Sequence, residues 1–255
     1  MDIHDAAIKG YSKASARYEQ GRPEYPEDLI GWLERELGLR CGMRVADLGA
    51  GTGKFTRLLA RTGAQVVAIE PVDAMRERIG QAAPGAVVLG GTAEAIPLDD
   101  AAIDALVCAQ AFHWFANDRA LREIHRVLRP GGKLGLVWNV RDESSAWGAA
   151  ITAIIAPYEG NVPRFHTGQW RLPFEPKTMF DEPRRTVFAH HHVGSFEQVV
   201  IDRIMSVSFI AALPESEKAA VEARLRALPD AFPALRAAQI KFPYRTEAWL
   251  TTRRP

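Results

Sequence analysis

The stretch from Arg44 to Pro71 constrains the fold more than any other part of the 255-residue sequence. It begins with a short apolar run, Val45 to Leu48, which is typical of a buried strand. A glycine turn from Gly49 to Gly53 follows, and the next apolar stripe has helical spacing and ends at Gly63. A second apolar run then closes on an acid, Glu70. Strand, glycine turn, helix, strand and acid, in this order, predict one half of a nucleotide-binding α/β unit.

The glycine turn and its two flanking acids favour one kind of nucleotide. Glycine permits positive φ and lets a ligand approach the main chain, and an acid after the second strand can accept hydrogen bonds from ribose hydroxyls. Glu70 follows Asp47 at about the 20-residue spacing of such an acid. A dinucleotide fingerprint has glycine where this chain has Lys54, and the carboxylate of Asp47 would repel a pyrophosphate. A cationic ligand is therefore favoured over a dinucleotide.

The motif Asp47-Leu48-Gly49-Ala50-Gly51-Thr52-Gly53 closely resembles the cofactor motif of class I S-adenosylmethionine-dependent methyltransferases, of the type 11 or UbiE-like group. Glu70, Gly91 to Leu98 and Leu128 to Leu134 extend the resemblance in the family's order. Together these stretches cover roughly residues 40 to 140. A looser resemblance, to the small-molecule branch that includes trans-aconitate methyltransferase, takes in both ends of the chain.

This resemblance implies an α/β, Rossmann-like fold: a seven-stranded, mostly parallel sheet with helices on both faces and an antiparallel last strand. Later apolar runs predict strands at residues 87–89, 103–109, 134–138, from 186, and 242–250. We expect one structural domain with three parts: an N-terminal cap (1–40), the S-adenosylmethionine-binding core (41–140), and the rest of the sheet with a substrate-side lid (141–255). The lid is the irregular, proline- and aromatic-rich stretch from Pro157 to Pro183, since long irregular segments in compact domains are usually functional.

The resemblance also implies S-adenosyl-L-methionine as the cofactor and S-adenosyl-L-homocysteine as the product. The residues expected at the cofactor are Asp47, Gly49, Ala50, Gly51, Glu70, Pro71, Met75, Ala93, Glu94, Gln110, Tyr18 and Arg22. Asp47 either attracts the cofactor's ammonium or supports the glycine turn. Met75 either contacts the adenine or fills the core, and Glu94 either meets the adenine edge or is a solvated loop carboxylate. Tyr18 and Arg22 belong to an arm that either covers the cofactor or only docks on the domain.

Amide, imidazole and indole side chains gather after the fourth predicted strand, from Gln110 to Phe115. We expect His113 and Trp114 to be catalytic. Trp114 and Tyr18 offer rings for a cation–π contact with the sulfonium. His113 is the candidate general base, because imidazole titrates near 6.5; its alternatives are a hydrogen bond to the substrate or a brace for the loop. The expected substrate-binding residues are Tyr25, Phe112, Trp138 and Asn139.

The predicted reaction is an in-line displacement that moves a methyl group to an O, N or C atom of a small molecule. Positioning in a dry pocket supplies much of such catalysis. A carboxylate is one candidate acceptor, and it would need no base. We expect the acceptor pocket between the Phe112–Trp114 loop and the Pro157–Pro183 segment. The alternatives are a nicotinamide-dependent oxidoreductase and a non-catalytic Rossmann-like binding protein.

Charge and hydropathy argue against other partners. The net charge is +1, which gives no whole-surface attraction for nucleic acid or membrane. No apolar run approaches the ~20 residues of a membrane span, and the start of the sequence lacks a signal-peptide pattern. We therefore expect a cytoplasmic monomer or homodimer with reduced cysteines. No metal site is expected, because the consecutive residues His190 to His192 point to alternate faces of a strand.

Overall fold

The computed structural model describes residues 21–175 and 178–255, which form two compact units built from separate segments. Unit 1 contains the described part of its first segment, residues 21–24, together with Asn139–Val162 and Ala189–Arg245. Unit 2 contains Tyr25–Trp138, Pro163–Phe188 and Thr246–Pro255. The three sequential parts expected from the sequence stay a prediction.

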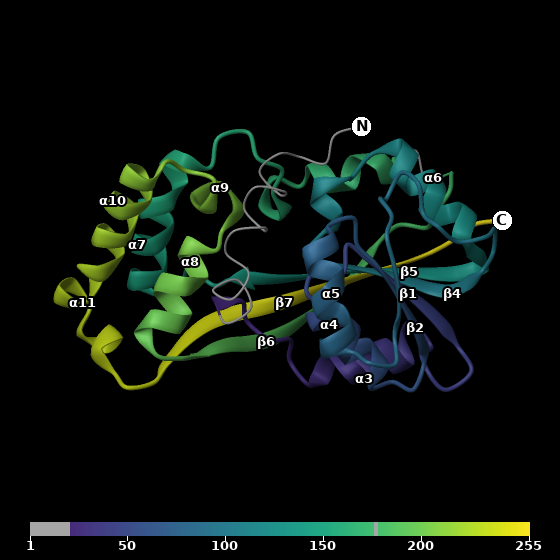
Figure 1. Ribbon diagram of the computed structural model, residues 1–255, viewed down its shortest axis with the longest axis horizontal. Coiled ribbons are helices and arrows are strands. Elements are labelled where there is room, and N and C mark those ends of the chain that lie inside the picture. Colours follow the sequence, from purple (N-terminus) through teal and green to yellow (C-terminus); the bar gives the residue numbers. More distant parts are fainter. Residues whose placement is uncertain (1–20, 176–177) are drawn as a thin grey trace. The chain divides into compact units, whose positions relative to one another are not determined.

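The strands form a seven-stranded sheet in the order β3-β2-β1-β4-β5-β7-β6 (Figure 1). The strands, in chain order, are β1 (Arg44–Leu48), β2 (Gln65–Ile69), β3 (Val87–Leu89), β4 (Ile103–Ala109), β5 (Leu128–Arg141), β6 (Arg184–Gly194) and β7 (Ile240–Thr252). The first five pair in parallel. Because β1 is central in this set, its ligand-binding carboxyl end is flanked by the ends of β2 and β4. The predicted Rossmann-like sheet is confirmed.

β7 runs antiparallel to β5. The amide of Asp142 donates to the carbonyl of Pro243 at 3.0 Å, and the amide of Arg253 donates to Gly132 at 2.8 Å. Later residues of β5 thus meet earlier residues of β7, which is the antiparallel arrangement. The predicted antiparallel last strand is confirmed, and it lies between β5 and the edge strand β6.

β5 begins well before the expected start at Leu134. Ile103 of β4 pairs with Leu128, and Ala105 pairs with Lys133, so the intervening residues of β5 bulge out of the ladder. Gly131 in this bulge has φ of +72°. The apolar run from Leu134 predicted the later part of β5, and it did not show that strand pairing already begins at Leu128.

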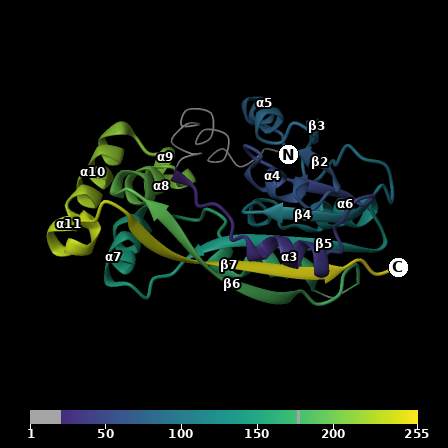
Figure 2. The same cartoon turned by 90° about the horizontal axis from the view of Figure 1, so that it is seen from below.

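Helices of unit 2 pack on the sheet through their apolar stripes. They are α3 (Asp28–Arg35), α4 (Lys54–Ala60), α5 (Asp73–Ala82) and α6 (Asp118–Val127). The helices α3, α4 and α5 follow one another side by side (Figure 2). Leu33 of α3 and Leu59 of α4 pack with Val45 of β1 in one buried cluster. The core of unit 2 therefore lies directly beneath the glycine turn that joins β1 to α4.

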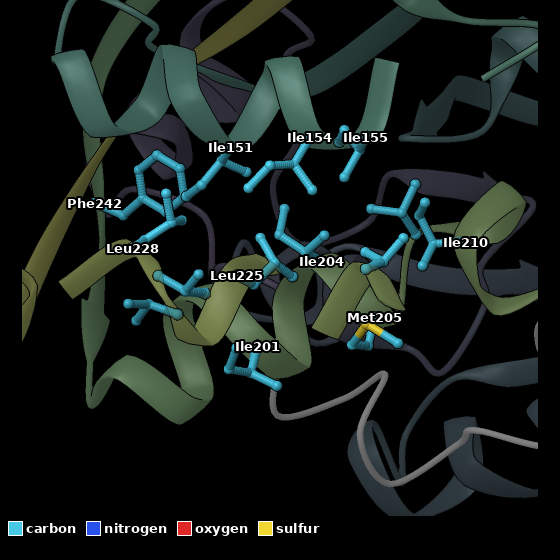
Figure 3. Packing of buried hydrophobic residues seen from close by; sticks show 14 of the residues in the cluster. Ile151, Ile154, Ile155, Ile201, Ile204, Met205, Ile210, Leu225, Leu228 and Phe242 are labelled. Carbon is cyan, nitrogen blue, oxygen red and sulfur yellow. The ribbon is translucent and has the colours of Figure 1, made fainter. Parts of the chain in front are cut away.

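Unit 1 has its own apolar core. Its helices are α7 (Ala146–Ile155), α8 (Arg203–Met205), α9 (Ser208–Ala211), α10 (Glu215–Arg226) and α11 (Leu228–Ala231), with a π-helical turn at Glu197–Asp202. Figure 3 shows Ile151 and Ile154 of α7 pointing toward Ile204 and Leu225. Within the described ranges, no helix is long and apolar enough to cross a bilayer.

Replacing Ile204 by Ala is expected to lower the free energy of unfolding by roughly 2–5 kcal/mol, because it opens a cavity in this core. Ile204 is fully buried. The measurement is urea unfolding followed by circular dichroism. The matched control is Val193→Ala on β6, which is 48% exposed and should cost less than about 1 kcal/mol. Equal losses in the two variants would contradict the packing described for unit 1.

Candidate functional site

The glycine turn between β1 and α4 takes a backbone path that other residues rarely adopt. Gly49, Gly51 and Gly53 have φ of 74°, 58° and 86°. A Cβ on Gly49 would lie 2.8 Å from the Cβ of Ala111, so this glycine lets the turn pack against the loop after β4. A Cβ on Gly51 would meet nothing within 4 Å. The main chain at Gly51 is therefore open to a ligand.

Glu70, at the end of β2, is bound to this turn. Its Oε2 accepts a hydrogen bond from the amide of Gly51 at 2.9 Å, and its Oε1 accepts one from the amide of Val72 at 3.1 Å. Glu70 is 5% exposed, and burial raises the pKa of its carboxyl, while the two amides and the charge of Arg76 oppose that rise. An ionised carboxylate can accept about four hydrogen bonds, so Glu70 keeps lone pairs for ribose hydroxyls.

Asp47 lies beneath the turn and is fully buried. Its Oδ2 accepts a hydrogen bond from the hydroxyl of Thr56 on α4 at 2.7 Å, and its Oδ1 has no hydrogen-bond partner within the described part of the chain. Burial raises the pKa of Asp47 to about 7; the Thr56 bond opposes this rise and the charge of Glu70 adds to it. Asp47 thus supports the start of α4, and its contact with a cofactor ammonium stays a prediction.

Three other predicted cofactor residues lie in packed surroundings. Ala50, Ala93 and Met75 are buried, and Met75 is part of α5. Pro71 is half-buried between β2 and α5. These positions are consistent with a site whose base consists of small or apolar side chains. None of these residues identifies a ligand by itself.

Glu94 has a role that the sequence did not suggest. Its Oε1 accepts a hydrogen bond from Nδ2 of Asn117 at 3.0 Å. The Oδ1 of Asn117 accepts one from the amide of Ala120 and so caps α6. Glu94 therefore joins the loop after β3 to the first turn of α6.

Gln110 follows β4 in a strained conformation. Its φ is +59°, a value rare for a residue with a Cβ, and its amide donates to Val137 of β5 at 2.8 Å. Strain of this kind persists where the surroundings enforce it, and it is common at functional sites. The bend at Gln110 turns the chain into the short 3₁₀ turn Phe112–Trp114, which carries His113.

The imidazole of His113 is oriented by Trp138 on β5. Indole Nε1 donates to Nδ1 of His113 at 3.1 Å. Because an indole can only donate, Nδ1 is the unprotonated nitrogen, and the proton of the neutral ring is on Nε2. His113 in this arrangement presents a hydrogen-bond donor. The roles that the sequence left open for His113, as general base, substrate contact or brace for the loop, stay predictions.

A cavity of about 190 Å³ lies between the loop after β4 and the segment after residue 162, both within unit 2. The side chains around it are His113, Trp114, Phe115, Ala116, Asn117, Pro163, Arg164, Thr167, Gln169 and Trp170. This is the region where the sequence places the acceptor pocket. Phe112 does not line the cavity: it is fully buried and packs on Phe115 and Phe174, with ring centroids 5.7 Å apart in each pair.

Aromatic rings pack behind His113. The ring of Trp138 lies 4.6 Å from that of Phe165 and 4.8 Å from that of Trp170, centroid to centroid. Trp138 and Trp170 are almost completely buried. This cluster fixes the donor of the His113 bond and keeps water from that side of the ring.

The remaining predicted residues are Tyr18, Tyr25, Arg22 and Asn139, and their predicted roles stay predictions. Tyr18 is outside the described residues. Tyr25 packs edge-on against Phe55, with ring centroids 4.8 Å apart. Arg22 and Asn139 belong to unit 1, where Arg22 Nη2 donates to the carbonyl of Ser206 and Asn139 Nδ2 donates to that of Glu24, both at 3.0 Å. The structure therefore places Arg22 and Asn139 in a different unit from the glycine turn.

Two features of the site were missed in the sequence. Thr56 could have been singled out from the sequence, because it is a polar residue directly after Phe55 in the predicted helix. The structure shows that Thr56 is fully buried in α4. Arg164 and Gln169 had no such signal, since the segment around them has no periodicity. Only the fold brings them to the cavity.

The histidines of β6 alternate as predicted: His191 is exposed and His192 is buried. Among residues 21–175 and 178–255, no three His, Cys, Asp or Glu side chains gather as metal ligands would.

Comparisons with known proteins agree with this geometry. Residues 46–136 match the family model described as a methyltransferase domain. An uncharacterized methyltransferase-like protein of Schizosaccharomyces pombe is 37% identical over 251 residues, which cover 97% of each chain. An uncharacterized methyltransferase of Mycobacterium tuberculosis is 40% identical over 228 residues, 88% of this chain and 87% of that protein.

Solved structures show the same fold. A putative methyltransferase from an antibiotic biosynthesis pathway of Anabaena variabilis has a TM-score of 0.63 at 19% identity, covering 90% of this chain and 98% of that chain. A Haemonchus contortus N-methyltransferase, in complex with phosphomonomethylethanolamine and S-adenosylhomocysteine, has a TM-score of 0.59 at 12% identity, covering 100% of this chain and 60% of that chain. This chain belongs to the methyltransferase family, in the class I S-adenosylmethionine-dependent fold group. The narrower resemblance to trans-aconitate methyltransferase stays a prediction.

The raised pKa of Asp47 makes stability depend on pH. The folded-state value of about 7 lies above the ordinary value of 3.8. The protonated form is therefore the one that folding favours: its contribution is fully present below pH 3.8 and is lost as the pH rises through about 7. Asp47→Asn should thus gain stability relative to the cofactor-free wild type as the pH rises from 5 to 8, a window chosen around the shift.

The measurement is urea unfolding at the two pH values. The control is Asp99→Asn, which replaces an exposed acid of the same unit and should show no such gain. A constant difference between Asp47→Asn and wild type at the two pH values would show that Asp47 is not held in a buried, desolvated state.

Proposed function

We propose that this protein binds S-adenosylmethionine at the glycine turn of unit 2 and transfers its methyl group to a small molecule. The observation that carries the proposal is the bond between Glu70 and the amide of Gly51. This bond places an acid with spare lone pairs next to an open stretch of main chain. Together they match the needs of a nucleoside: an acceptor for ribose hydroxyls and room for close approach.

The charge of the site supports the choice of cofactor. Asp47 and Glu70 are both acids, and Oδ1 of Asp47 has no partner within the described residues. A cofactor with an ammonium and a sulfonium would be attracted to these acids, whereas a pyrophosphate would be repelled. Lys54 stands where a dinucleotide fingerprint has its third glycine.

The cofactor supplies an activated methyl group and its own leaving group, so the protein's task is to bind and orient. Trp114 offers an aromatic face beside the cavity, which favours a cationic centre by ~1–2 kcal/mol where water is excluded. His113 offers its Nε2 proton as a hydrogen-bond donor. The Trp138 cluster keeps His113 in this orientation.

The acceptor that fits best is a small molecule whose attacking atom is unprotonated at neutral pH. A His113 that donates a hydrogen bond would orient a carboxylate without removing a proton from it. We therefore place a carboxylate oxygen first among the O, N and C acceptors. The known proteins support methyl transfer at the level of the family, and the Haemonchus contortus structure holds the demethylated product of this cofactor.

The proposal also covers the kind of acceptor, the location in the cell and the oligomeric state. The net charge of +1 supports a small-molecule acceptor over a nucleic acid or a membrane surface. We propose that the protein works in the cytoplasm as a monomer or homodimer.

Glu70→Ala is expected to lower the affinity for S-adenosylhomocysteine at least tenfold, since hydrogen bonds to a charged group contribute ~1.5–3 kcal/mol each. The measurement is isothermal titration calorimetry on the folded variant. Glu77→Ala, at an exposed position of the following helix α5, is the matched control and should bind as the wild type does. Unchanged affinity in Glu70→Ala would refute the assignment of the ribose-binding acid.

The His113 and Trp114 variants test the acceptor side, once an acceptor has been found by screening small acids for methyl incorporation. His113→Ala and Trp114→Ala should each lower kcat/KM at least tenfold and leave S-adenosylhomocysteine affinity nearly unchanged. His113→Gln keeps an N–H donor and should retain more activity than His113→Ala. If Gln and Ala at this position are equally inactive, a donor role does not explain the effect of His113.

A further inference from the structure

Unit 1 gathers three arginine side chains from segments far apart in the sequence. Arg203 of α8 is 92% buried, with 8% of its surface exposed. Its Nε donates a hydrogen bond to the hydroxyl of Tyr244 at 3.1 Å. Its Nη1 is buried and has no hydrogen-bond partner within the described part of the chain. A guanidinium group is thus held in place at one end and left with an unsatisfied donor at the other.

Arg141, the last residue of β5, repeats this pattern. Its Nη1 is buried and lacks a hydrogen-bond partner among the described residues. The bond from the amide of Asp142 to the carbonyl of Pro243 places Arg141 beside the part of β7 that carries Tyr244. Arg141 and Arg203 therefore approach the same region of unit 1 from two different elements.

Arg22 approaches the region from a third segment. Its Nη2 donates to the carbonyl of Ser206 at 3.0 Å, and the hydroxyl of Ser206 donates to the carbonyl of Arg203 at 2.9 Å. A Cβ on the preceding residue, Gly21, would lie 2.7 Å from the amide nitrogen of Arg203. Gly21 is therefore packed tightly against the start of α8.

Burial lowers the pKa of Arg203 to about 10; Tyr244 opposes this effect, while the positive charges of Arg22 and Arg141 add to it. Arg203 and Asp202 are buried in the described part of unit 1, whereas Arg22 and Arg141 are half-buried and lie close enough to Arg203 for their charges to affect its pKa. Like charges in a desolvated place raise the free energy of the folded state, and unsatisfied buried donors raise it further.

We propose that Arg203 and Arg141, with Arg22 and Tyr244, form an oxyanion-binding site in unit 1 that takes a carboxylate or phosphate group of a small molecule. A guanidinium group binds either group through two parallel hydrogen bonds. Tyr244 accepts from Arg203, so its own O–H proton remains to be donated to the same ligand. The inference goes beyond the proposed function, because binding at this site does not depend on methyl transfer.

The competing explanation is that the arginines only brace the fold, through Ser206 and Tyr244. The two explanations differ in what happens when a guanidinium group is removed. If the arginines only brace the fold, the variant protein should be less stable than the wild type. If the arginines form a ligand site, the ligand-free variant should be as stable as the wild type or more stable, because the charge repulsion and the unsatisfied donor are removed together.

The experiment measures thermal unfolding and calorimetric binding of the full-length protein with succinate and, in a second arm, with inorganic phosphate. Succinamide is the neutral control, and sodium chloride keeps the ionic strength equal. At least one anion should raise Tm and bind at a single site per chain. Succinamide should neither raise Tm nor bind. The arm that binds more tightly identifies the oxyanion as carboxylate or phosphate.

The variants are Arg203→Gln and Arg141→Gln, with the exposed Arg224→Gln of α10 as the matched control. We expect each of the first two to lower anion affinity at least about tenfold without lowering Tm, and Arg224→Gln to behave as the wild type. A lower Tm with unchanged anion affinity would establish the brace and overturn the site. Absence of binding by both anions would overturn it as well.

S-adenosylhomocysteine binding is measured on the same proteins, so the two proposals fail separately. If the wild type binds S-adenosylhomocysteine but neither anion, the oxyanion site is refuted and the cofactor assignment stands. If an anion binds through Arg203 and S-adenosylhomocysteine does not bind, the cofactor assignment fails and the oxyanion site stands.

Discussion

The carboxylate of Glu70 joins the end of β2 to the glycine turn after β1, and the binding end of unit 2 depends on this connection. It accepts hydrogen bonds from the amides of Gly51 and Val72, so two loops that leave neighbouring strands share one acid. The turn itself is anchored from below, where Asp47 accepts a hydrogen bond from Thr56 at the start of α4. Glu70 thus shapes the surface at which we propose that the cofactor binds, and Asp47 secures the helix behind it.

Charge is distributed differently in the two units. Around the glycine turn the buried ionisable groups are acids, which suits a cofactor with a positive sulfonium and ammonium. In unit 1 the positive charges of Arg22 and Arg141 add to the effect of burial on Arg203, which suits an anion. Each set costs free energy when no ligand is present, since buried charges lack the solvation of water. Sites that bind charged molecules commonly carry such a cost, because the ligand offsets it on binding.

Local patterns in the sequence were sufficient for the order of the strands and for the glycine turn, since each is set by residues close together in the chain. The start of β5 was missed because a turn at residues 130–132 stays inside the strand as a bulge. The bonds from Trp138 to His113 and from Asn117 to Glu94 join residues more than twenty positions apart, and neither has a local pattern. The contact of Arg22 with the carbonyl of Ser206 likewise joins distant parts of the chain, and the predicted role of Arg22 at the cofactor stays a prediction. Periodicity reports which side of an element is buried, and it carries no information on which distant side chain lies opposite.

The central claim is that the glycine turn of unit 2 binds a cationic nucleoside rather than a dinucleotide. Equilibrium dialysis of the wild-type protein against S-adenosylmethionine and, separately, against NAD and NADP tests this claim most directly. The account predicts saturable binding of S-adenosylmethionine with one molecule per chain and no binding of either dinucleotide. Binding of a nicotinamide cofactor in place of S-adenosylmethionine would contradict the account, because Asp47 and Lys54 would then not select against a pyrophosphate.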